Sequence, residues 1–266
     1  MSKANILNIF KAGALITTLA STAVVGAKVP STAEFNPEQT IAIEHIVHEY
    51  LLNKPEILSE AFEVLQKKQQ QTQQEQVKNS IAQHSKDLLT EHLTVAGSAK
   101  GTVTMIEFFD YQCGHCKTMH GVISKLIEQN PNVRVIYKEF PIFGQTSEDA
   151  SRVAIAAAMQ GKYLQVHEAL IKSEKHLDKK SAIDIAKSAG VNLPKLISDM
   201  NSKVVTEALT SVKKQAEQLS LQGTPAFIIL TTTPEGTLSA NSKTAFIPGG
   251  APIATLQSMI NAAEGK

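Results

Sequence analysis

Residues 103–116 read Val-Thr-Met-Ile-Glu-Phe-Phe-Asp-Tyr-Gln-Cys-Gly-His-Cys, and the rest of the chain is interpreted from this segment. The apolar run predicts a buried strand, which delivers Cys113 and Cys116 to the start of a helix expected over 114–129. These are the only two cysteines among 266 residues. Unpaired N–H groups and the positive dipole of a helix start stabilise a thiolate, the species that attacks disulfides. We therefore expect a redox-active dithiol.

Other uses of a close cysteine pair fit less well. Attachment of a c-type haem requires His directly after the second Cys, where this chain has Lys117. A zinc site needs about four ligands, and Cys113, Cys116 and His120 supply three. A purely structural disulfide across so short a loop would restrain little of the unfolded chain. We expect no metal and no cofactor apart from the Cys113–Cys116 disulfide itself.

The N-terminus has the pattern of a secretory signal. Lys3 and Lys11 precede an uncharged stretch over 12–26, and small residues end at Ala27. This pattern predicts a signal peptide over 1–27, with the mature chain starting at Lys28. The stretch is short for a spanning helix, although an uncleaved membrane anchor remains an alternative. An exported chain with one close cysteine pair is not held together by disulfides, so we expect it to act on the disulfides of other proteins.

Charge and length restrict the remaining classes. The formal net charge is +1 and no block of basic residues dominates, so nothing indicates a nucleic-acid partner. The mature residues suffice for one large domain and an appendage.

The appendage, residues 28–94, is expected to be helical. Asn36 and Pro37 form a helix start, and Asn53 to Glu56 form a second one. The stretch 66–76, rich in Gln and Lys, indicates a solvated helix or a flexible linker that continues toward Val77, Ile81, Leu88 and Leu89. Two such helices cannot bury their own apolar stripes. We expect an oligomerisation arm, with packing against the main domain as the alternative.

The main domain is expected over 95–266, after a boundary at 95–101. The predicted strands are 103–109, 133–139, 226–231 and 244–247. The predicted helices are 114–129, 147–160, 162–173, 181–189, 194–220 and 252–262. The order is β-α-β, a helical block over about 145–218, a hairpin and a closing helix, with a right-handed parallel crossover in the first unit. This order indicates an α/β thioredoxin fold: a mixed β-sheet with helices on both faces and an inserted helical subdomain.

The motifs then suggest a family. Residues 107–116 resemble the active-site segment of DsbA-like thiol–disulfide oxidoreductases, which are exported thioredoxin-fold proteins with a helical insertion. Residues 138–142, 223–227 and 248–251 resemble the second strand, the cis-proline loop and the last turn of that family, in the same order. The resemblance covers about 95–266. The N-terminal part, with 53–58, is similar to the appended domain of oligomeric relatives of the Com and ScsC type.

The resemblance and the helix position together assign roles. Cys113 is expected to be the nucleophile and Cys116 the resolving thiol. His115 lies between them and can stabilise the Cys113 thiolate, or it is an exposed histidine without a role. Gly114 departs from the proline found there in many strongly oxidising relatives, so the reduction potential does not follow from the resemblance.

Pro225 is cis by resemblance and faces Cys113, unless it is an ordinary trans proline that opens a strand. The backbone of Thr224 can pair with an extended substrate as an added strand, and Thr at this position resembles isomerase-type relatives. Glu107 is by resemblance a buried acid that accepts the proton of the resolving thiol, with Lys138 as a partner; a surface salt bridge is the alternative. Phe109, Tyr111, Phe140 and Phe143 are candidates for an apolar peptide groove.

These features predict a periplasmic enzyme that forms or isomerises disulfides in exported proteins, and they leave an outer-membrane association open. Its partners would be unfolded or misfolded cysteine-containing clients, a membrane redox partner, and further copies of itself, most simply in a homodimer. The Thr224 position and the arm favour isomerase activity, and the overall resemblance favours oxidase activity. The alternative is a non-catalytic chaperone or a copper-binding protein, since Cu(I) binds thiolates.

Overall fold

The computed structural model describes residues 35–90, 93–174 and 177–266, so the predicted signal peptide lies outside the described residues. The chain divides into two compact units, one ending at Phe62 and one formed by Glu63–Lys266. Within the described ranges, no helix combines the length and the apolar character that crossing a membrane requires.

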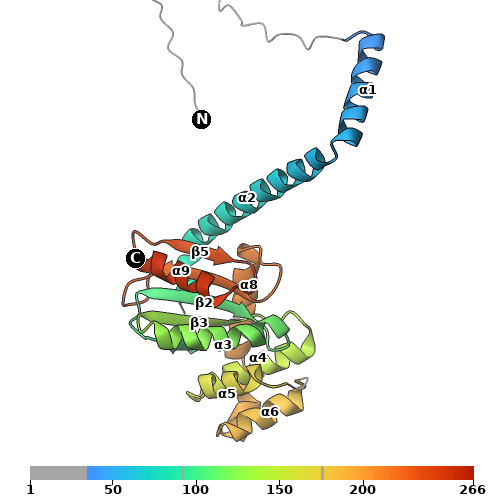
Figure 1. The fold of residues 1–266 in the computed structure, drawn as a ribbon. Helices are drawn as coiled ribbons and strands as arrows, with labels where there is room; N and C mark the ends of the chain where they lie inside the picture. The colour runs from blue at the N-terminus through green and yellow to red at the C-terminus, as the bar shows by residue number, and fades with distance from the viewer. Residues whose placement is uncertain (1–34, 91–92, 175–176) are drawn as a thin grey trace, which may run out of the picture. The chain divides into compact units, whose positions relative to one another are not determined.

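The second unit contains a mixed sheet (Figure 1). Its strands are β1 (Val95–Gly97), β2 (Val103–Phe109), β3 (Val133–Glu139), β4 (Ala226–Thr231) and β5 (Thr244–Ile247), in the order β1-β3-β2-β4-β5. Only the pair β2–β3 is parallel. The predicted thioredoxin-like fold with a mixed sheet is confirmed. Strand β1 was not predicted, because three residues are too few to show an alternating pattern.

Helices cover both faces of this sheet, which is why every residue of β2 is buried. Met105 and Phe109 point to the face covered by α3 (Gly114–Gln129) and α9 (Ile253–Glu264). Ile106 and Phe108 point to the other face, in a cluster with apolar residues of α8 (Lys203–Gln218) and of the last turns of α2 (Glu56–Leu89). The strand therefore connects two cores, and its C-terminal end leads directly into the Cys-x-x-Cys segment.

The inserted helices are α4 (Gln145–Ala158), α5 (Tyr163–Ile171), α6 (Lys179–Ser188), α7 (Leu193–Asp199) and α8. The bounds of α4, α5 and α6 differ from the predicted ones by at most two residues. The single helix predicted over 194–220 is wrong, since the chain breaks between α7 and α8. Ser202 is the N-cap of α8, where its side chain accepts a hydrogen bond from the Val205 N–H. Because the Ser202 side chain caps the first turn of α8, it favours the start of a new helix over the continuation of α7.

The first unit contains α1 (Pro37–Asn53), which begins where the sequence predicted. The Asn36 side chain accepts from the Gln39 N–H, and the Gln39 side chain accepts from the Asn36 N–H, a capping box with Pro37 in the first turn. No residue of α1 is buried. Its exposed apolar side chains are Ile41, Ile43, Ile46, Val47, Tyr50 and Leu52.

Helix α2 runs without a break through the Gln-rich stretch, as a continuous helix of 34 residues. Its last turns belong to the core of the second unit: Val77, Ile81, Leu88 and Leu89 are buried in the same cluster as Phe108. The compact unit therefore begins before the boundary expected at 94/95. These apolar residues are spaced to face the sheet, so this part of the helix is a layer of the domain rather than a connector.

Candidate active site

Cys113 occupies the N-cap position of α3, at the end of the loop that follows β2. Its N–H donates to the Asp110 carbonyl over 3.1 Å, which closes the turn before the helix. Both cysteines are reduced, and their exposed fractions are 4% for Cys113 and 1% for Cys116. The cysteine that we expect to be the nucleophile thus lies at a helix start, next to N–H groups that have no partner within the helix, and this position is the one that the sequence predicted.

The loop before β4 meets Cys113 from the far end of the sequence. The Thr224–Pro225 peptide bond is cis, as the resemblance implied. The Cys113 thiol donates to the Thr224 carbonyl over 3.3 Å between Sγ and O. The Thr224 hydroxyl is buried and has no hydrogen-bond partner. The fold therefore brings together the two predicted segments that are 111 residues apart in the chain.

A groove of about 490 Å³ runs past these residues. His115 and Met119 of α3 line it, together with Thr224 and Pro225. The turn over 248–252, the last of the four sequence motifs, completes it. His115 is exposed and borders the space in which a substrate would lie. Thr224, whose carbonyl accepts from the Cys113 thiol, thus lines a groove that could receive an extended peptide.

Burial alters the acid–base behaviour beneath the groove. Burial and the nearby Glu107 carboxyl raise the pKa of the Cys116 thiol far above its usual value. Burial, followed by the charges of Cys113 and Glu139, raises the pKa of Glu107 to about 8. Glu107 therefore carries its proton at neutral pH. A buried acid that loses its proton near pH 8 can exchange a proton with a thiol as the thiol leaves or attacks.

The expected pairing of Glu107 with Lys138 is wrong. In the parallel register Glu107 lies opposite Tyr137, and Lys138 lies opposite Phe108. Successive side chains of a strand point to opposite faces, so Lys138 points away from the face that carries Glu107 and the dithiol. The sequence spacing predicted the right strand and the wrong face.

The predicted peptide-groove aromatics also separate. Phe109 and Tyr111 are buried in the core on the α3 side, where their rings meet edge to face at 5.0 Å. Phe143 is 56% exposed. Of the four candidates, Phe140 and Phe143, which follow β3, keep exposed surface, and neither is among the residues that line the groove beside the cysteines.

Sequence reasoning missed Asp110, which organises the active-site loop. Its carboxylate is buried and accepts from the Gln112 N–H and the Ser147 hydroxyl through Oδ1, and from the Ile142 and Phe143 N–H groups through Oδ2. This one side chain ties the turn before Cys113 to the loop after β3 and to the start of α4. An aspartate directly after a buried strand was the available signal, because Asp side chains often accept from nearby backbone N–H groups in turns.

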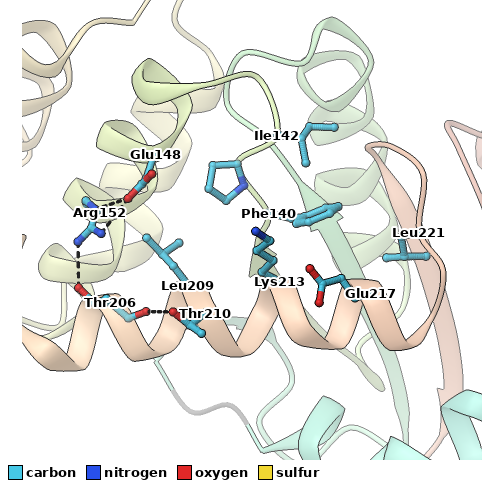
Figure 2. A pocket seen from close by; sticks show the side chains of 11 residues that line it. Phe140, Ile142, Glu148, Arg152, Thr206, Leu209, Thr210, Lys213, Glu217 and Leu221 are labelled. Carbon is cyan, nitrogen blue, oxygen red and sulfur yellow. Dashed lines mark hydrogen bonds and ion pairs between the residues drawn. The ribbon is translucent and has the colours of Figure 1, made fainter.

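A larger cavity of about 510 Å³ lies elsewhere, between the loop after β3, α4 and α8 (Figure 2). Phe140, Ile142 and Leu209 contribute apolar surface to it. At its edge Arg152 donates to Glu148 and to the Thr206 hydroxyl. Of the predicted site residues only Phe140, a peptide-groove candidate, lines this cavity, whereas His115, Thr224 and Pro225 line the groove beside the cysteines, which is therefore the candidate site. Across the described ranges, no three His, Cys, Asp or Glu side chains are grouped as the ligands of a metal would be.

Comparison with known families places two parts of the chain. Residues 104–261 match the DSBA-like thioredoxin domain, and residues 39–72 match the N-terminal domain of the copper resistance protein ScsC. The structure is similar to that of BcfH from Salmonella enterica Typhimurium, with a TM-score of 0.73 and 30% identity, covering 86% of this chain and 97% of that one. Proteus mirabilis ScsC in a transitional conformation shares the fold, with a TM-score of 0.60, 24% identity, and coverage of 87% and 99%.

Two curated relatives cover about half of the chain. The thiol:disulfide interchange protein DsbA of Pseudomonas syringae pv. tomato is 27% identical over 146 residues, which are 53% of this chain and 67% of that protein. The Na(+)/H(+) antiporter NhaA 3 of Salinispora tropica is 22% identical over 137 residues, 51% of this chain. The match spans only 21% of the antiporter.

Proposed function

Because the chain belongs to the DSBA-like thioredoxin domain family, we propose that it is a periplasmic thiol–disulfide oxidoreductase that forms or isomerises disulfides in exported proteins through Cys113 and Cys116. One observation carries the proposal. The sulfur of a free cysteine at a helix start lies 3.3 Å from the carbonyl oxygen that precedes a cis proline, and that carbonyl's residue and the proline line a groove.

As an oxidase, the protein starts with the Cys113–Cys116 disulfide. A client thiolate attacks the Cys113 sulfur, a client–Cys113 bond forms, and Cys116 leaves as a thiolate that takes up a proton. A second client thiolate then attacks the client sulfur of this mixed disulfide, and Cys113 leaves as a thiolate. The client loses two electrons and the dithiol gains them. Restoring the disulfide requires an oxidant, which we assign to a membrane redox partner.

As an isomerase, the protein starts as the dithiol seen in the structure. The Cys113 thiolate attacks a wrong client disulfide and one client sulfur leaves as a thiolate. Another client thiolate then attacks the mixed disulfide and releases Cys113, so no electrons are gained or lost overall. Attack by Cys116 instead would release the client with its disulfide reduced.

The burial of Cys116 and Glu107 supports a role for both groups in the resolving step, in which Cys116 attacks the mixed disulfide. Burial favours the protonated form of Cys116, so this thiol needs a base when it attacks the mixed disulfide. We assign this role to Glu107 in the molecules in which its carboxyl is ionised, a fraction that grows as pH rises toward its pKa of about 8. The Thr224 carbonyl, which accepts from the Cys113 thiol here, would accept from a client backbone N–H in the complex.

The N-terminal helices support a homo-oligomer. The apolar side chains of α1 are exposed between 39% and 66%, which is unusual for a helix without a partner. An oligomer places several dithiols around one client, which favours isomerisation. Ile46→Lys should weaken assembly, whereas His45→Lys, at the exposed neighbouring position, should not. Sedimentation or light scattering measures the mass, and a wild-type monomer at micromolar concentration would contradict the oligomer.

The functional test is the refolding of a scrambled-disulfide protein. We expect the full chain to restore the native disulfides, Ile46→Lys to oxidise reduced client but isomerise poorly, and Cys113→Ser to do neither. Equal isomerisation by the wild type and a monomeric Ile46→Lys would assign the arm to another task. Undiminished exchange by Cys113→Ser would contradict the enzymatic proposal.

The match of 39–72 to the ScsC N-terminal domain supports a second candidate, a copper-binding or chaperone role on the same fold. Cys113 and Cys116 could together hold Cu(I) as thiolates. A role that depends on the dithiol is lost in Cys113→Ser, whereas suppression of client aggregation by a chaperone should survive. Copper titration of the reduced wild type and of Cys113→Ser separates these possibilities.

A further inference from the structure

A buried polar network lies directly behind the active-site loop. The Tyr111 hydroxyl donates to Oε1 of Glu139 over 2.9 Å, and the Tyr163 hydroxyl donates to the same oxygen over 2.9 Å. Tyr111 precedes Cys113 by two residues, Glu139 ends β3, and Tyr163 begins α5. One carboxyl oxygen therefore joins the active-site loop, the sheet and the helical insertion.

His167 extends the network from the next turn of α5. Its Nδ1 lies 3.0 Å from the Tyr111 hydroxyl. Since the single Tyr111 hydroxyl proton is donated to Glu139, Nδ1 must carry a proton and donate to the Tyr111 oxygen. Burial lowers the pKa of His167 to about 3, so the ring is neutral and Nε2 is unprotonated. The Tyr111 oxygen thus accepts from His167, and both phenol hydroxyls donate to Glu139 Oε1.

Glu139 is also suited to accept without a charge. Burial is the main cause that raises its pKa to about 8, against the hydrogen bonds from Tyr111 and Tyr163, which lower it. Its second oxygen, Oε2, is buried with no hydrogen-bond partner in the structure. A proton on Oε2 leaves Oε1 as a neutral carbonyl oxygen that accepts from both phenols.

The network is described in the reduced protein, because both cysteines are free thiols. A disulfide is a stronger oxidant when its dithiol form is stabilised. Resting on the proposed function, we propose that Glu139 is a positioning residue that holds the active-site loop through Tyr111 in its dithiol conformation and thereby makes the Cys113–Cys116 disulfide more oxidising.

Tyr111→Phe and Tyr163→Phe form a matched pair for the test. Each removes one hydroxyl that donates to Glu139 Oε1 over 2.9 Å, but only Tyr111 belongs to the loop that carries Cys113. Both should lower the urea midpoint, and Tyr111→Phe should lower it further, because this substitution also removes the acceptor of the His167 Nδ1 proton. The equilibrium of the full-length protein with reduced and oxidised glutathione should shift toward the disulfide form in Tyr111→Phe alone, by about twofold to tenfold, the range of one net hydrogen bond.

Glu139→Gln provides the rescue. Its amide oxygen can still accept from both phenols, so its glutathione equilibrium should stay near that of the wild type. Glu139→Leu removes the acceptor and should match Tyr111→Phe, provided that circular dichroism shows it folded. An unchanged equilibrium in Tyr111→Phe, or an equal shift in Tyr163→Phe, would overturn the inference. A wild type that forms no Cys113–Cys116 disulfide with glutathione would instead defeat the proposed function, so the two failures are distinguishable.

Discussion

Two buried carboxyl groups, Glu107 on β2 and Glu139 on β3, lie on the sheet face that α3 covers. Burial is the main cause that raises the pKa of each from 4.5 to about 8 in the folded protein. Between pH 4.5 and about pH 8 these two carboxyl groups are ionised in the unfolded chain and protonated in the folded protein. Their contribution to the free energy of unfolding therefore falls as pH rises. The stabilisation is complete below pH 4.5 and is lost through about pH 8.

Urea unfolding of the reduced protein at the two ends of that window measures this slope. We expect Glu107→Gln to flatten it, since the amide does not titrate. Glu128→Gln, an exposed substitution on α3, should leave it unchanged. A slope in Glu107→Gln as steep as that of the wild type would contradict the burial of Glu107 as a neutral acid.

The Thr224 hydroxyl gives a second prediction at this scale. It is buried without a partner, and such a group costs about 1–3 kcal/mol. Thr224→Val should therefore leave the free energy of unfolding unchanged or raise it. Thr104→Val is the matched control, because the Thr104 hydroxyl is buried and accepts from Arg134. The control should lose about 1–3 kcal/mol. A comparable loss in Thr224→Val would show that its hydroxyl is satisfied.

At the scale of the element, α2 is buried near its C-terminal end and exposed near its N-terminal end. Leu88 is buried against the sheet, whereas Leu58 is 57% exposed. We expect Leu88→Ala to destabilise the second unit by about 2–5 kcal/mol, because it leaves a cavity in a packed core. Leu58→Ala should not change the unfolding of that unit. Thermal or urea denaturation checks this, and equal effects of the two substitutions would contradict the assignment of the last turns to the core.

This division also explains what the sequence could predict for α2. The sequence indicated a solvated helix or a flexible linker that continues toward Val77, Ile81, Leu88 and Leu89, and all four of these side chains are buried. That these side chains cover the sheet, and hence belong to the domain, was not visible in the sequence, because a pattern specifies a buried face and not its partner. The break before α8 was not predicted for a related reason. In the sequence Ser202 cannot be told from an ordinary helix residue, and its role as the N-cap is seen only in the structure.

At the scale of the whole molecule, the order of the four motifs along the chain predicted the fold and the candidate site better than the amino-acid composition did. Three of the four motifs, 107–116, 223–227 and 248–251, contribute residues to the groove, whereas 138–142 contributes to the second cavity. The supporting groups were harder to predict. Asp110, Glu139 and His167 make hydrogen bonds to residues 28 to 56 positions away in the sequence, and no local pattern encodes such bonds. Lys138 shows a second limit. The sequence indicated that it lies on the strand next to Glu107, but it did not indicate on which face of the sheet its side chain lies.

The central claim is that Cys113 attacks or accepts the client sulfur and Cys116 resolves the bond. Trapping tests this most directly: Cys116→Ser and Cys113→Ser are each incubated with a scrambled-disulfide client, and the products are identified by non-reducing electrophoresis and peptide mass spectrometry. We predict a mixed disulfide at Cys113 that accumulates in Cys116→Ser and no adduct in Cys113→Ser. An adduct at Cys116 in Cys113→Ser, or no adduct in either variant, would contradict the account.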